Sequence, residues 1–118
     1  MMENYTVKAF DDRTIWIQNG KLHRLDGPAA IYNNGTEFWF QNGKRHRLDG
    51  PAIEWADGTE FWLQNDKFHR IGGPAIERAD GSVEYWEKGK RIPDPKKTKE
   101  MTVEQICEQL GYNVKVVK

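Results

Sequence analysis

The chain has 118 residues, 37% of them hydrophobic, and its 18 basic residues are balanced by 18 acidic ones. Without a net charge, there is no global field that would attract nucleic acid or an anionic membrane. The single cysteine, Cys107, excludes an internal disulfide, and no apolar run approaches the roughly 20 residues that span a bilayer. The N-terminus lacks a signal-peptide pattern, so we expect a cytoplasmic protein.

Residues 1–13 predict an opening strand that caps the rest of the fold. Tyr5, Val7 and Ala9 fall on one side of an alternating pattern, and the run from Asp11 to Arg13 is typical of a turn. Such a segment alone is too short to form a stable unit, so we expect it to pair with the strand that follows.

Residues 14–92 contain one phrase in three copies. His-Arg-Leu-Asp-Gly-Pro-Ala occupies residues 23–29 and 46–52, and it returns with two changes at 69–75. Successive copies are 23 residues apart. Self-similarity at a fixed period is typical of a repeat architecture.

Turn signals flank every copy of the phrase. Asn19-Gly20 and Asn42-Gly43 precede two copies and favour tight type I′ hairpins, because both central positions accept positive φ. A second signal follows each copy, at residues 34–35, 57–58 and 80–81. Two reversals per copy let all copies stack in one orientation. We therefore predict a mainly β protein: an antiparallel sheet of about three 23-residue hairpin repeats.

Alternation sorts the strand side chains onto two faces. One predicted face carries Ile15, Ile17, Phe38, Phe40, Phe61, Leu63 and Tyr85. The other carries Trp16, Trp39, Trp62 and Trp86. Because neither face is purely polar, one must meet a core, and the tryptophans must be covered by turns, by the tail or by a partner.

The composition changes after residue 92. Residues 93–101 are polar and contain two prolines, which is typical of a linker. Residues 102–118 begin with a capping box, continue with an apolar stripe and end in alternation, so they predict a short helix and strand. So small a unit is unstable alone. We expect it to dock on the sheet or on a second copy, which would make a homodimer.

Three residue types recur in register and form the candidate partner-binding set. The set comprises Trp16, Trp39, Trp62, Trp55, His23, His46, His69, Arg24, Arg47 and Arg70. Arginine beside tryptophan suits cation–π contacts, and both residues dominate interface hot spots. The histidines have two readings: bonds to the backbone or to the aspartates at the corner, or a row of ligand contacts.

The same residues do not predict a catalytic or metal site. Stacked two-stranded repeats would hold the histidines about 10 Å apart, whereas zinc ligands lie about 2 Å from the ion. No nucleophile, base and orienting group form a recognisable arrangement, and there is no phosphate-binding glycine loop. We expect neither an enzyme nor a cofactor.

The pattern over residues 14–91 resembles MORN repeats. Trp39, Asn42-Gly43-Lys44, Gly50 and Asp57-Gly58 match that skeleton. Phe38 and Phe61 depart from it where the family has glycine, and so does the Arg-Leu-Asp-Gly-Pro-Ala corner. The phrase resembles a MORN-like subfamily of bacterial, bacteriophage and large-virus proteins. The resemblance implies an extended sheet for protein or lipid contacts, without enzymatic activity.

We therefore predict a non-catalytic protein–protein interaction module. By resemblance only, the repeat type suggests a phage or mobile-element protein that binds and inhibits a host defence factor in the host cytoplasm. One alternative is binding of nucleic acid or a nucleotide by the Trp, Arg and His row, with bases stacked on the rings. Another is membrane-surface association, which the zero net charge disfavours.

Overall fold

The computed structural model describes residues 4–95, which are mainly β with antiparallel strands. The strands are β1 (Thr6–Ala9), β2 (Arg13–Gln18), β3 (Lys21–Leu22), β4 (Ala30–Tyr32), β5 (Glu37–Phe38), β6 (Phe40–Gln41), β7 (Lys44–Arg45), β8 (Ile53–Glu54), β9 (Glu60–Phe61), β10 (Leu63–Gln64), β11 (Lys67–Phe68), β12 (Ile76–Glu77), β13 (Val83–Glu87) and β14 (Lys90–Ile92). The predicted helix and strand of residues 102–118, and most of the linker before them, lie outside the described residues.

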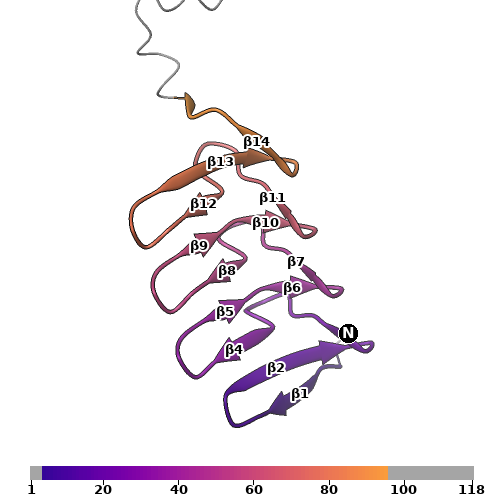
Figure 1. Ribbon diagram of the computed structural model, residues 1–118. Coiled ribbons are helices and arrows are strands. Elements are labelled where there is room, and N and C mark those ends of the chain that lie inside the picture. The colour runs from indigo at the N-terminus through magenta and orange to yellow at the C-terminus, as the bar shows by residue number, and fades with distance from the viewer. Residues whose placement is uncertain (1–3, 96–118) are drawn as a thin grey trace, which may run out of the picture.

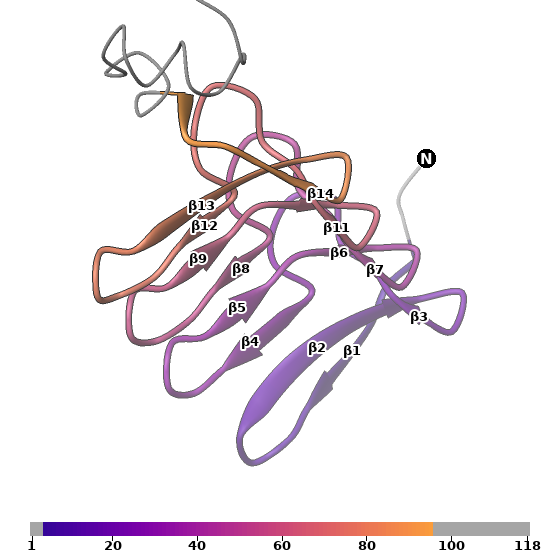
Figure 2. The same cartoon turned by 45° about the horizontal axis from the view of Figure 1, so that its top comes forward.

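Most of these strands belong to one stepped sheet. Within residues 4–95 the sheet has 10 strands in the order β1-β2-β4-β5-β8-β9-β12-β13-β14, with β3 paired to β2. The pairs β6–β7 and β10–β11 form separate hairpins beside it. All hairpin tips point to one side, and successive units keep the same orientation (Figures 1 and 2). This is the arrangement that two reversals per copy predict.

The hairpin turns have the backbone that their sequences favour. Asn19 and Gly20 have φ of 52° and 75°, and Asn42 and Gly43 have 53° and 79°. Both residues of each pair lie in the left-handed region, as a type I′ turn requires. A further turn of this kind, at Lys88 and Gly89, joins β13 to β14 with φ of 53° and 79°. Lysine at its first position is the reason that the dipeptide rule did not predict it.

Each central tryptophan is the pivot between the sheet and a hairpin. The amide of Trp39 donates to the carbonyl of Ala52 in the sheet, at 2.7 Å, and its own carbonyl accepts from His46 in the hairpin, at 3.0 Å. Trp16 and Trp62 make the equivalent bonds. The chain therefore leaves one set of partners and joins another at the tryptophan, which divides β5 from β6 and β9 from β10.

The histidines join each hairpin to the next. Nδ1 of His23 accepts a hydrogen bond from the amide of Asn42 at 3.0 Å, and Nδ1 of His46 accepts from Asn65 at 3.1 Å. His69 accepts in the same way from Lys88 at 2.9 Å. The three imidazoles thus bond to the backbone, which was one of the two readings of the sequence. An acceptor at Nδ1 places the proton of the neutral ring on Nε2.

The sheet ends where this acceptor is missing. Ile92 stands 23 residues after His69, so the last hairpin has an aliphatic side chain where the others have an imidazole. Such a side chain cannot accept a bond from a further hairpin amide. The last strand, β14, accordingly ends at Ile92, where the sequence predicts the end of the sheet.

The small core lies on the face opposite the tryptophan row. Ile53 is the cross-strand neighbour of both Phe38 and Phe61, and Ile53 and Leu63 are fully buried. Half-buried aromatic rings pack over them, with Trp55 and Phe61 at 4.2 Å between ring centroids. This face, which we call the aromatic face, buries its aliphatic residues beneath its own rings.

The predicted positions of Tyr85 and Trp86 are wrong. Trp86 is the cross-strand neighbour of Arg91, the position that Phe40 and Leu63 hold in their hairpins, and its ring lies 5.3 Å from that of Phe68. It therefore belongs to the aromatic face, and Tyr85 takes the tryptophan position. One extra residue upstream moves this tryptophan one place closer to its turn, and a shift of one residue exchanges the two faces of a strand.

We expect His23→Leu to lower the free energy of unfolding by about 1–3 kcal/mol, because the amide of Asn42 loses its acceptor at a buried position. Urea denaturation measures this change. His69→Leu is the matched control, since His69 is only half-buried and water can replace it. Equal losses in the two variants would contradict the argument.

Asp66 gives the stability a defined pH dependence. Its carboxylate accepts bonds from the amide and the Nε of Arg45, at 2.8 and 2.9 Å, and these bonds hold its pKa below the ordinary value of 3.8. The stabilisation is therefore present above the ordinary pKa and is lost as the pH falls through the lower, folded pKa.

Asp66→Asn should therefore be less stable than the wild type at neutral pH, and the difference should vanish in acid. Thermal unfolding of both proteins between neutral pH and pH 2 measures it. A difference that is independent of pH would show that the charge of Asp66 contributes nothing.

Candidate protein-binding surface

Each arginine of the repeated phrase lies on the tryptophan of its own copy. The guanidinium carbon of Arg24 is 4.1 Å from the centre of the Trp16 ring, and that of Arg47 is 3.9 Å from Trp39. Arg70 and Trp62 are 3.8 Å apart in the same arrangement. These distances are typical of cation–π contacts. The arginines and the tryptophan row, predicted to bind a partner together, therefore contact each other.

Further bonds fix the arginine at the corner of the chain. Nη1 of Arg47 donates to the carbonyl of Pro51 at 3.2 Å and lies 3.4 Å from Glu54, and its Nε donates to Asp49 at 3.2 Å. Arg24 has the equivalent proline and aspartate partners. The third copy has Gly72 in place of the aspartate, and there Arg70 keeps its proline and glutamate partners.

The glycine of the phrase leaves room for the guanidinium. A Cβ at Gly50 would lie 2.6 Å from Cζ of Arg47, and one at Gly27 would lie 2.7 Å from Cζ of Arg24. The cation is therefore held between a tryptophan ring on one side and bare backbone on the other. The alanine that ends each copy, such as Ala52, is fully buried. Histidine, arginine, aspartate, glycine, proline and alanine thus all act inside the fold.

The leucine position alone has no such internal contact. Leu25, Leu48 and Ile71 are 53%, 69% and 77% exposed, and they project from successive corners on the tryptophan side of the sheet. We call these three residues the aliphatic row. The sequence-based site did not include them, although an aliphatic residue kept between arginine and a turn in every copy is a signal that could have found them.

Trp55 does not lie with the other predicted contact residues. Its ring packs on the aromatic face, edge-on to Phe38 at 6.1 Å and to Phe61 at 4.2 Å between centroids. The predicted set is therefore divided between two faces: the tryptophan row lies on one and Trp55 on the other. Sequence alternation could have shown this, because Trp55 is two residues from the buried Ile53.

An acidic row crosses the tryptophan side of the sheet. Cross-strand pairing aligns Glu37 with Glu54, Glu54 with Glu60, and Glu60 with Glu77. Burial and the neighbouring carboxylates of Glu77 and Glu54 raise the pKa of Glu60. This side is therefore not a basic track for a phosphate backbone. A base stacked on the tryptophans would also have to displace the guanidinium that covers each ring.

Two further searches cover the described part of the chain only. Among residues 4–95, no group of three or more His, Cys, Asp or Glu side chains could hold a metal ion. Over the same residues, no helix has the length and apolar character needed to cross a membrane.

Comparison with protein-family models, with curated proteins and with solved structures gives no match for this chain. The functional argument therefore rests on the geometry of the corners and on the resemblance noted in the sequence.

We expect Gly50→Ala to lower the free energy of unfolding by about 1–2 kcal/mol, because the new methyl group displaces Arg47 from Trp39. The side chain of Arg47 is flexible at its end, so the fold should persist. Denaturation of the two single variants and of Gly50→Ala/Arg47→Ala closes a double-mutant cycle. Strictly additive losses would contradict the contact between the two sites.

Proposed function

We propose that the protein is a non-catalytic protein-binding module and that the aliphatic row is its contact surface. The observation that carries the proposal is the exposure of Leu25, Leu48 and Ile71 in a phrase whose other residues all act inside the fold. Aliphatic side chains held out at fixed spacing by rigid corners lose little entropy on binding. The tryptophan, arginine and histidine residues form the support beneath them.

The spacing of the row indicates the shape of its partner. Each copy contributes two strands to the sheet, so successive corners are about 10 Å apart. Seven residues of an α-helix advance by about 10.5 Å. A partner helix with an apolar side chain at every seventh residue would therefore meet all three corners in register. Binding of this kind is a helix laid along a row of apolar anchors.

The chain also fits the proposal of a MORN-like repeat protein. Its units stack in one orientation at the 23-residue period of the phrase, and their turns coincide with the Asn-Gly positions that carry the resemblance. A protein without catalytic groups acts on its partner by covering a surface. We propose occlusion of a host factor, in a phage or mobile-element setting, as the biological use of the module.

The test is affinity purification of the tagged protein from its host, with and without nuclease, followed by mass spectrometry. A protein partner should be retained by the wild type after nuclease treatment and lost from Leu48→Glu/Ile71→Glu. Cross-linking with mass spectrometry should place the contact on a helix of that partner. The two substituted side chains project into solvent, so the variant should unfold at the wild-type temperature.

Val83→Glu is the matched control, because Val83 is also an exposed aliphatic residue but lies outside the row. It should retain the partner. Retention by the double variant would contradict the aliphatic row as the contact. A nuclease-sensitive complex would instead favour the nucleic-acid alternative.

A further inference from the structure

The aromatic face is filled between its second and third units. The ring of Trp55 packs edge-on between Phe38 and Phe61, and the ring of Phe61 lies 5.2 Å from that of Phe68. These rings cover the buried Ile53. The filled interval shows what the fold builds when every aromatic position is occupied.

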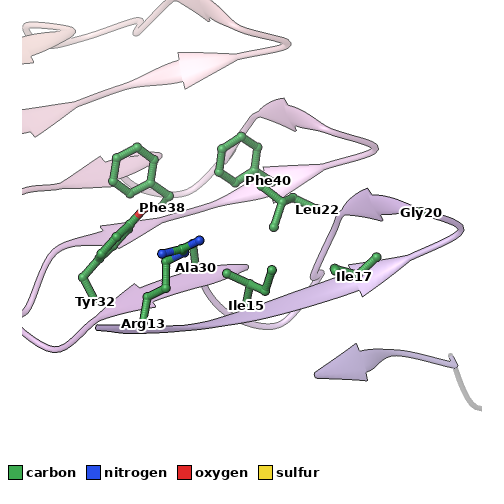
Figure 3. A pocket seen from close by; sticks show the side chains of 9 residues that line it. All are labelled: Arg13, Ile15, Ile17, Gly20, Leu22, Ala30, Tyr32, Phe38 and Phe40. Carbon is green, nitrogen blue, oxygen red and sulfur yellow. The ribbon is translucent and has the colours of Figure 1, made fainter. Parts of the chain in front are cut away.

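The first interval of the same face is hollow. A cavity of about 380 Å³ lies there, open on one side, and Figure 3 shows its lining side chains gathered over β2, β4 and β5. Ile15 stands where Phe38 and Phe61 stand in later units, and Leu22 stands where Phe68 does. The hollow therefore arises because smaller aliphatic side chains replace rings.

A second departure from the repeat places a cation at the same cavity. Thr36 and Thr59 each accept a bond from a backbone amide of the next unit, both at 3.1 Å, and Arg13 holds the equivalent position in the first unit. The first unit makes its tie with backbone instead, since the amide of Asn33 donates to the carbonyl of Asp12 at 2.9 Å. Arg13 thus lines the hollow and has no part in that tie.

The charge around the opening is suited to an anion. Arg13 pairs with the exposed Asp12 at 3.0 Å, and an exposed pair of this kind is weak and exchangeable. Lys8 is the cross-strand neighbour of Ile15, so a second cation stands at the edge of the same face. Tyr32 adds a hydroxyl to the lining.

We propose that this hollow binds a small apolar molecule that carries one carboxylate. The aliphatic and aromatic walls would bury the apolar part, and Arg13 would exchange Asp12 for the carboxylate of the ligand. Phe38 and Phe40 close the hollow toward the next unit, so it accepts a compact molecule and not an extended chain. The site lies on the face opposite the aliphatic row, so it stands independently of the proposed function.

Octanoate and octanol are the matched probes, and methyl NMR of the full chain is the measurement. Octanoate should shift the methyl signals of Ile15, Ile17 and Leu22 and leave those of Leu48 and Ile71 unchanged. Octanol should bind about tenfold more weakly, the scale of one charge-assisted hydrogen bond. Equal affinities, or shifts spread along the whole stack, would overturn the proposal.

Two variants restore the pattern of the later units. Ile15→Phe/Leu22→Phe should fill the hollow and lower octanoate affinity at least about tenfold. Arg13→Thr keeps the hollow and should bring octanoate down to the affinity of octanol. Wild-type affinity in Arg13→Thr would overturn the ionic contact, and this variant decides the matter even if the double variant fails to fold.

Leu48→Ser, on the opposite side of the sheet, is the control and should bind octanoate as the wild type does. A short peptide with a C-terminal leucine gives the final arm. If it bound more tightly than octanoate, the site would belong to the end of a protein chain, and the proposal of a small ligand would be wrong.

Discussion

The structure depends on a guanidinium held between a tryptophan ring and a glycine backbone. In a single-layer sheet no second layer covers either face, so each face must be covered by its own side chains and turns. Arg24, Arg47 and Arg70 bring the corner segments down onto Trp16, Trp39 and Trp62. On the aromatic face, rings cover aliphatic residues instead. The two faces are thus closed by different means.

A second constraint acts along the stack. Every unit offers an imidazole acceptor to the next hairpin, and Thr36 and Thr59 offer hydroxyl acceptors at the opposite turns. Each unit therefore contacts only its neighbours, as in other repeat proteins. Stability should then accumulate from neighbour to neighbour, and a unit can change its solvent-facing residues without disturbing distant ones.

Agreement and disagreement between copies carry different information. Where the copies agree, most residues have an internal contact that explains the agreement; the aliphatic row is the exception, and this is why it carries the proposed function. Where the first unit disagrees, the changes converge in space: Ile15, Leu22 and Arg13 all line one hollow. Independent drift would not place three departures around a single cavity.

The sequence by itself determined the mainly β class, the turns at Asn19-Gly20 and Asn42-Gly43, and the common orientation of the units. These features depend on local φ preferences and on a period of two, which neighbouring residues settle among themselves. Only the tertiary structure decided how the two faces are used. It showed that arginine covers tryptophan, that Trp86 changes face and that the leucine of the phrase is exposed. Those outcomes depend on contacts between residues far apart along the chain and on a one-residue shift at the last hairpin, which no local pattern specifies.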